Sequence, residues 1–181
     1  MRRECFALIA VVTLGCRTPR PCPHADATTT QWTLVTADGA DVAIPAGWEL
    51  RARASVDSAF DVYSRDHVLV VLVSMVRASE PDVSLRQALQ RRLDEASAPG
   101  ELRMSSQREG WWYDESVIES GRLVAACAVD YDAATPVAAT PVAILATIRE
   151  TNGRSLSRLR YEQAGGREML CGIAASVRLT Q

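Results

Sequence analysis

Lysine is missing from this chain of 181 residues, because all 20 of its basic residues are arginines. Its absence excludes Schiff-base chemistry, a phosphate-loop lysine and a serine–lysine catalytic pair, each of which needs a lysine amine. Histidine is nearly missing as well, since His24 and His67 are the only two. One histidine in the folded part cannot build a multi-histidine metal site, and we expect no metal and no cofactor.

Strong net charge is the third absence. The 20 basic and 22 acidic residues leave a formal charge of −2, which gives no general attraction to nucleic acid. Hydrophobic residues make up 48% of the chain, an ordinary fraction for a globular protein with a real core. The length fits one domain with an N-terminal extension.

The N-terminal segment has the pattern of an export signal. Arg2 and Arg3 give a positive start, Phe6 to Gly15 form a ten-residue apolar run, and Cys16 follows. The run matches the core of a signal peptide and is too short to span a bilayer, which takes about 20 residues. The residues VTLGC resemble the lipobox of bacterial lipoproteins. The resemblance implies a signal peptide over residues 1–15 and a diacylglycerol, with acyl chains such as palmitate, on Cys16.

An ordinary secretory cleavage site competes with this interpretation, because Ala25-Asp26-Ala27 has the A-x-A form. It lies far beyond the apolar run. Residues 16–30 are rich in proline and threonine and are expected to form an extended tether. Arg17 stands where an Asp would resemble an inner-membrane retention signal, which favours the outer membrane in a Gram-negative cell. We therefore expect a location in the cell envelope, facing the periplasm or the outer surface.

Residues 31–181 have the pattern of one α+β domain, an antiparallel sheet with helices packed on it. Asp38-Gly39 between two apolar runs predicts a hairpin. The run 68–76 is apolar almost throughout and predicts a central strand covered on both faces. Alternation or apolar runs predict further strands over 48–54, 102–107, 111–119, 122–131, 142–148 and 155–162. Helices are predicted over 84–96, with a Ser84–Gln87 capping box, and over 167–177.

Three landmarks resemble the PsbP-like fold, which includes DcrB-like bacterial lipoproteins. They are Ile44-Pro-Ala-Gly-Trp48, the helix start Ser84-Leu85-x-x-Ala88-Leu89, and the closing Ile173-Ala-Ala-Ser176-Val-Arg178-Leu. The resemblance implies a mostly non-enzymatic family of binding or assembly proteins. The family has no shared active-site motif, so no ligand residue can be transferred to this chain.

No group of residues is predicted to be catalytic. His67 lies beside a predicted turn without a G-x-S-x-G elbow, and we expect it to be solvated. The acidic pairs have no spacing that selects a glycosidase dyad or a calcium loop. They are Asp57/Asp61, Asp114/Glu115 and Asp130/Asp132.

Two surface features remain as binding candidates. Arg154, Arg158 and Arg160 form a local cluster, either an anion or partner patch or the solvated face of an edge strand. Trp111 and Trp112 belong to one strand, so at most one of them can join a given surface, and core packing is the alternative.

Three cysteines remain after the leader and Cys16. Cys127 lies on the bulky face of a predicted strand, and Cys171 lies on the helix expected to cover the sheet. In an exported protein they form either a disulfide or two buried free thiols. Cys22 would stay unpaired in the tether.

These features favour a lipid-anchored, non-catalytic binding or assembly protein of the cell envelope. Its partners would be the membrane, through the anchor, and a protein or envelope component. An envelope hydrolase or transferase and a toxin-protective lipoprotein are the alternatives.

The lipid anchor is directly testable. We expect Cys16→Ser to abolish incorporation of radioactive palmitate and to release the protein from the membrane fraction, because stable attachment needs two or more acyl chains. Cys22→Ser is the matched control and should stay acylated. Continued firm membrane attachment of Cys16→Ser would refute the anchor.

Overall fold

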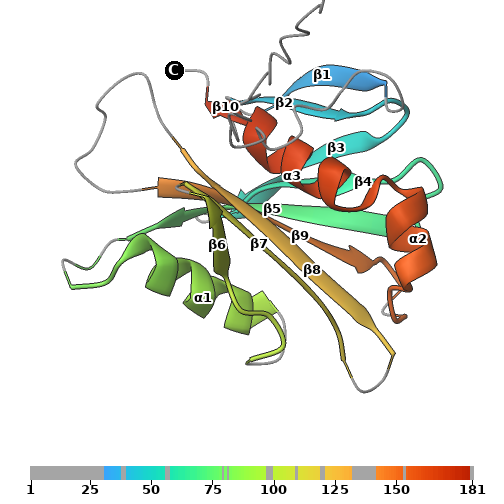
Figure 1. The fold of residues 1–181 in the computed structure, drawn as a ribbon. Helices are drawn as coiled ribbons and strands as arrows, with labels where there is room; N and C mark the ends of the chain where they lie inside the picture. The colour runs from blue at the N-terminus through green and yellow to red at the C-terminus, as the bar shows by residue number, and fades with distance from the viewer. Residues whose placement is uncertain are drawn as a thin grey trace, which may run out of the picture.

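The computed structural model describes residues 31–37, 40–55, 58–78, 80, 82–96, 100–108, 110–118, 121–131, 142–152 and 154–179. Cys16, Cys22 and the tether lie outside these residues. The described part has an α+β fold, as the sequence predicted, in which two antiparallel sheets and three helices pack together (Figure 1).

The elements follow one another as a strand-rich first half, a helix, a meander and two C-terminal helices. The strands are β1 (Trp32–Ala37), β2 (Ala40–Pro45), β3 (Glu49–Ser55), β4 (Ser58–Tyr63), β5 (Leu69–Arg77), β6 (Ser105–Arg108), β7 (Trp111–Val117), β8 (Leu123–Asp130), β9 (Val142–Glu150) and β10 (Arg178–Leu179). The helices are α1 (Leu85–Ala96), α2 (Arg158–Gln163) and α3 (Gly166–Ser176).

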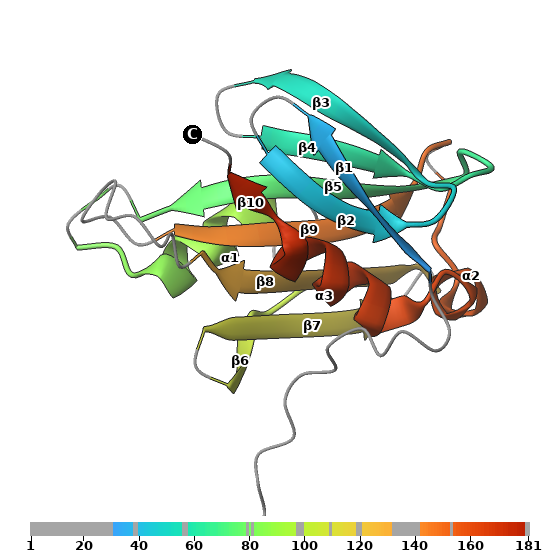
Figure 2. The same ribbon diagram turned by 90° about the horizontal axis from the view of Figure 1, so that it is seen from above.

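The larger sheet has seven strands in the order β3-β4-β5-β9-β8-β7-β6, and the smaller sheet has the order β1-β2-β10. The apolar run at β5 pairs with β4 on one side and with β9 along its whole length on the other. Helix α3 covers one face of the large sheet and α1 covers part of the opposite face (Figures 1 and 2). The predicted central strand, buried on both faces, is confirmed.

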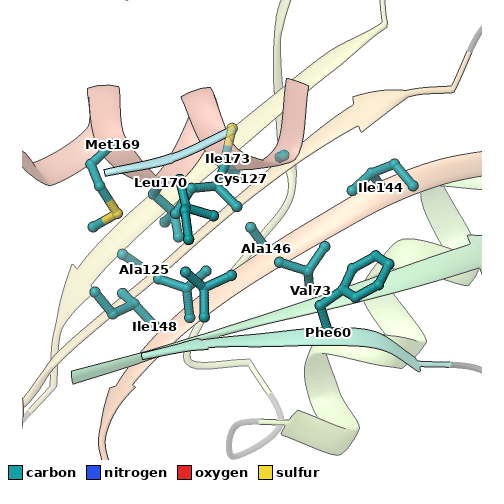
Figure 3. Packing of buried hydrophobic residues seen from close by; sticks show 14 of the residues in the cluster. Phe60, Val73, Ala125, Cys127, Ile144, Ala146, Ile148, Met169, Leu170 and Ile173 are labelled. Carbon is teal, nitrogen blue, oxygen red and sulfur yellow. The ribbon is translucent and has the colours of Figure 1, made fainter. Parts of the chain in front are cut away.

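The main core lies between the large sheet, α3 and the small sheet. Helix α3 directs Met169, Leu170 and Ile173 onto the inward faces of β8 and β9 (Figure 3). Its end is fixed to β2, because the hydroxyl of Ser176 accepts a 2.9 Å hydrogen bond from the backbone N–H of Ala43. The amphipathic pattern that predicted a C-terminal helix is therefore the pattern of a helix buried between two sheets.

A second core lies under α1. Leu89 and Leu93 of that helix are fully buried against the outward-facing residues of β8 and β9. The helix begins as the sequence predicted, since the side chain of Gln87 accepts a hydrogen bond from Ser84 N–H at 2.8 Å and Ser84 Oγ accepts one from Gln87 N–H at 3.3 Å. This capping box satisfies two backbone donors that the first helical turn leaves free.

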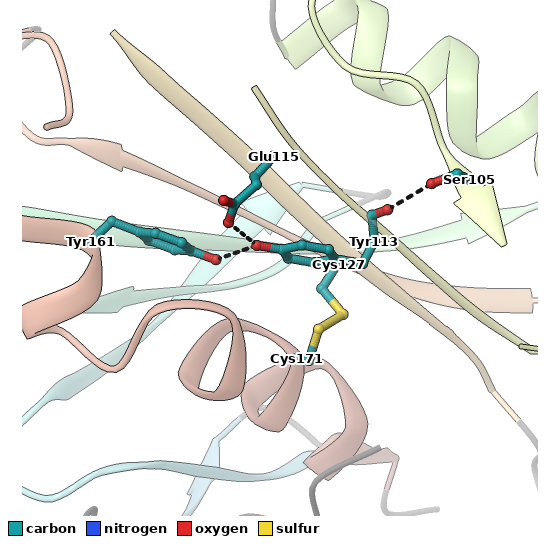
Figure 4. The surroundings of a disulfide bond; sticks show 6 residues. All are labelled: Ser105, Tyr113, Glu115, Cys127, Tyr161 and Cys171. Carbon is teal, nitrogen blue, oxygen red and sulfur yellow. Dashed lines mark hydrogen bonds between the residues drawn. A yellow bond between two sulfur atoms is a disulfide. The ribbon is translucent and has the colours of Figure 1, made fainter. Parts of the chain in front are cut away.

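Cys127 and Cys171 form a disulfide, so the structure selects one of the two alternatives that the sequence left open. The bond links the middle of β8 to α3 across the main core (Figure 4). Because the two residues are 44 positions apart, closing this loop stabilises the folded chain by about 4 kcal/mol in the chain-entropy model.

The strand predicted over 155–162 is wrong. The chain forms no regular element over 154–157 and then turns into α2. Ser157 caps this helix by accepting a hydrogen bond from Arg160 N–H at 3.3 Å, and Tyr161 packs inward. Gly165 and Gly166 follow with φ angles of 102° and 54°, which lets the chain reverse between α2 and α3.

A close contact between α3 and β1 yields a stability prediction. A Cβ atom on Gly172 would lie 2.7 Å from Cη2 of Trp32, and the indole is too rigid to give way. We expect Gly172→Ala to lower the free energy of unfolding by about 1–3 kcal/mol, the usual range for overpacking, measured by urea unfolding. Adding Trp32→Phe should recover part of the loss, because the shorter ring removes the clash. If the two changes are additive, this contact does not fix the distance between α3 and β1.

Candidate ligand-binding site between β8 and β9

The large sheet opens where β8 begins and β9 ends. The two strands pair from Asp130↔Ala143 to Ala126↔Thr147, but β9 continues to Glu150 and β8 begins at Leu123. Beyond the last pair each strand has a different neighbour. The end of β9 stays paired with β5, while Leu123 N–H donates a 2.8 Å hydrogen bond to the carbonyl of Leu156. The strands therefore diverge and leave an opening.

A cavity of about 210 Å³ lies in this opening. Leu72 of β5, Leu93 of α1 and Leu102 of the following loop give it apolar walls. Leu93 and Leu102 are almost fully buried, so these walls are part of the core beneath α1. The cavity thus has apolar walls that belong to the core, and exposed Arg149 and Arg154 also line it.

The charged residues at the cavity leave an excess of positive charge. Arg122 forms a salt bridge of 3.0 Å with Glu101, and the buried carboxylate of Glu150 forms one of 3.1 Å with Arg160. Arg149 and Arg154 also line the cavity. Neither guanidinium has a carboxylate partner among the described residues, so two positive charges remain uncompensated at the mouth.

The arginine cluster predicted from the sequence is thereby divided. Arg158 pairs with Glu115 at 3.0 Å, and Arg160 pairs with Glu150. Residues two apart on a helix do not face the same way, which is why Arg158 and Arg160 reach different partners. Arg160 also lines a wider hollow with Trp48, Arg65 and Gln163. Arg154 is the one member of the predicted patch whose guanidinium has no carboxylate partner in the part of the chain that the structure describes.

Arg149 was missed by the sequence analysis, although it lies at the cavity beside Arg154. It is the eighth residue of a mostly apolar strand, and nothing local separates it from any exposed strand end. The positive charge at the cavity depends on which arginines find carboxylates, and those carboxylates are distant in sequence. Glu101, for example, is 21 residues from its partner Arg122.

A second polar group lies in the main core, near the disulfide. The hydroxyl of Tyr113 donates to Glu115 and lies 3.1 Å from the hydroxyl of Tyr161, which comes from α2 (Figure 4). The guanidinium of Arg167 lies over the Tyr113 ring, 4.6 Å from its centre. Burial raises the pKa of the Tyr113 phenol and raises the pKa of Tyr161 to about 12. Both phenols stay protonated at neutral pH and act as structural hydrogen-bond donors.

The residues considered for catalysis lie apart from the cavity. His67 has a positive φ of 56° on the turn before β5, and half of its side chain is exposed. Its Nε2 lies 3.7 Å from Glu49, which is already bound by Arg51 at 3.0 Å. This exposed arrangement lacks the water-excluded pocket in which an acid–base pair is usually tuned.

The acidic pairs serve local hydrogen bonds where they are described. Asp114 accepts a 2.6 Å hydrogen bond from Arg103 N–H, and Glu115 binds Tyr113 and Arg158. Asp61 is nearly buried and lies next to the hydroxyl of Tyr63 at 3.4 Å. Asp132 and the side chain of Asp57 lie outside the described residues. Among the residues that are described, no group of three or more histidine, cysteine or acidic side chains could hold a metal ion.

The two tryptophans of β7 point to opposite faces, as the strand period requires. Trp112 packs against the core under α1, so core packing accounts for it.

None of the helices in the described part of the chain is both long and apolar enough to cross a membrane.

The comparisons with known proteins give no match. No protein-family model matches the chain, and no curated protein matches its sequence. The functional argument therefore depends on the residues and geometry of this chain.

The Tyr113–Glu115 pair predicts a specific acid sensitivity. The Tyr113 hydroxyl, and after it Arg158, lower the pKa of Glu115 from its ordinary 4.5. A carboxylate with a lowered folded-state pKa stabilises the protein above the unfolded pKa, and this stability is lost as pH falls through the folded value. We expect urea unfolding at a series of pH values below about 4.5 to show this loss in the wild type and not in Glu115→Gln.

Tyr113→Phe removes the largest cause of the shift and should move the acid transition toward pH 4.5. Parallel pH profiles for the wild type and Glu115→Gln would show that this carboxylate does not couple folding to pH.

Proposed function

We propose that this chain is a lipid-anchored, non-catalytic binding protein of the bacterial cell envelope, and that the opening between β8 and β9 is its binding site. The observation that carries the proposal is the apolar cavity whose mouth holds Arg149 and Arg154 without carboxylate partners among the described residues. A preformed cavity with a few convergent charged groups is the usual form of a small-molecule site.

The envelope location is supported by the N-terminal pattern that ends at Cys16. The Cys127–Cys171 disulfide is consistent with it, because such bonds persist in oxidising compartments such as the periplasm. Membership of the PsbP-like fold remains our proposal. It is supported by the three sequence landmarks and by the order of a hairpin, antiparallel strands and a closing helix.

A binding role rather than catalysis is favoured by the side chains around the cavity. Its described lining contains arginines, one glutamate, one threonine and apolar residues, and no histidine, cysteine or serine. One carboxylate oxygen of the glutamate, Glu150, is bound by Arg160. No activated nucleophile with a neighbouring base, the usual arrangement of covalent catalysis, can be assembled from these groups.

The experiment is purification of the full-length lipoprotein from membranes in a mild detergent, followed by native mass spectrometry. We expect the wild type to carry a small bound component, and the double variant Arg149→Gln/Arg154→Gln to carry much less of it, because a charge-assisted hydrogen bond contributes about 1.5–3 kcal/mol. Arg86→Gln removes the same charge from the exposed side of α1 and should retain the component.

Recovery of the component unchanged after long incubation supports a binding role. Conversion of the component by the wild type, or a wild type with nothing bound, would contradict the proposal.

A further inference from the structure

We propose that the β8–β9 cavity binds a compact organic anion, whose acidic head group is held by Arg149 and Arg154 and whose apolar body lies against Leu72 and Val124. This inference rests on the proposed function, because it names the ligand class of that same cavity. It is carried by three features: the charge of the cavity, its size, and a lining that combines arginines with apolar side chains.

The charge requires an anion. Four charged residues line the cavity, and two of them, Arg122 and Glu150, are paired with Glu101 and Arg160. Arg149 and Arg154 have no carboxylate partner among the described residues, and they would repel a cationic ligand. Arginine offers a planar fork of donors that matches the two oxygens of a carboxylate or a phosphate. The head group is therefore one of these anions.

The size requires a small ligand. The cavity volume of about 210 Å³ lies below the range of about 300–1,000 Å³ that accommodates drug-sized molecules. An apolar protein cavity of about 150 Å³ holds benzene, so the available space fits one ring or a short branched chain together with an acidic group. A long acyl chain or a complete phospholipid does not fit.

The apolar interior selects against a bare inorganic ion. Leu72 and Val124 belong to the apolar lining, and a fully hydrated inorganic phosphate would gain nothing from contact with them. An apolar body gains free energy in proportion to the area that it removes from water. The cavity should therefore bind a ligand with both an acidic group and an apolar body more tightly than a ligand with only one of the two.

Contacts between separate segments hold the ends of β8 and β9 apart, so the cavity stays open without a ligand. The Leu123–Leu156 hydrogen bond fixes the start of β8, and the Glu150–Arg160 pair fixes the end of β9. The Arg122–Glu101 pair ties β8 to the loop after α1. These contacts come from four separate segments, and closing the opening would break at least one of them.

The test uses the full-length lipoprotein in detergent micelles and isothermal titration calorimetry with five probes. Benzoate and phenyl phosphate carry both an apolar body and a head group. Acetate and inorganic phosphate carry the head group alone, and benzyl alcohol carries the body without charge. We expect benzoate or phenyl phosphate to bind at least about tenfold more tightly than each of the other three, and the comparison of the two identifies the head group.

The variants establish where the probes bind. Arg149→Gln and Arg154→Gln should each weaken binding of the preferred probe by about tenfold or more, and Arg86→Gln should leave it unchanged. Thermal unfolding of each variant, run in parallel, verifies that the fold is intact. Both target side chains are exposed, so large losses of stability are not expected.

Three results would overturn the inference. These are equal binding of acetate or phosphate and the aromatic anions, equal binding of benzyl alcohol, and binding that is insensitive to both arginine variants. If an arginine-dependent native component is found on the purified protein while these probes fail, the proposed function stands and the compact-anion inference falls. If neither the probes nor a native component binds, both fall.

Discussion

Helix α3 is the element on which the rest of the structure depends. It supplies the buried face that joins the seven-stranded sheet to the small sheet, and Cys171 bonds it covalently to Cys127 in the middle of β8. Apolar burial holds this face, and the disulfide limits how far α3 can separate in the unfolded chain. Gly172 allows Trp32 to approach the helix, and Ser176 binds the backbone of Ala43, so the hairpin β1–β2 is positioned by the same helix.

The candidate site follows from how two central strands of the large sheet end. Strand β9 serves two neighbours, and it pairs with β5 over its full length but with β8 only as far as Thr147. The segment after β9 returns through Leu156 to the start of β8 and then enters α2, whose Arg160 reaches Glu150. The opening is therefore the space between two strand ends that are held by different partners, and its walls belong to the core beneath α1.

Electrostatic pairing decides which arginines near the cavity can bind a ligand. Most arginines near the site have a carboxylate partner, and such pairs at the surface contribute little to stability. Their effect on recognition is larger, because a compensated guanidinium offers a ligand less than a free one. The distribution of partners leaves Arg149 and Arg154 as the groups that give the cavity its charge.

The sequence by itself determined the elements whose signal is local. The capping box at Ser84, the apolar run of β5 and the amphipathic stripe of α3 predicted their structures correctly, because periodicity and caps act within a few residues. Proximity of Cys127 and Cys171 was also foreseen, but sequence left bonding and free thiols as alternatives. The prediction of a strand over 155–162 was wrong, because Tyr161 packs inward and contacts Tyr113, which lies 48 residues away in the chain.

Only the tertiary structure decided the site. Arg154 was recognised as a candidate but was grouped with Arg158 and Arg160, whose partners lie on other elements, and Arg149 gave no signal at all. A cavity exists where strands diverge, and divergence depends on hydrogen bonds and ion pairs between segments far apart in the chain. Residue types and spacing fix which side chains are available, whereas long-range packing fixes which of them meet and which stay free.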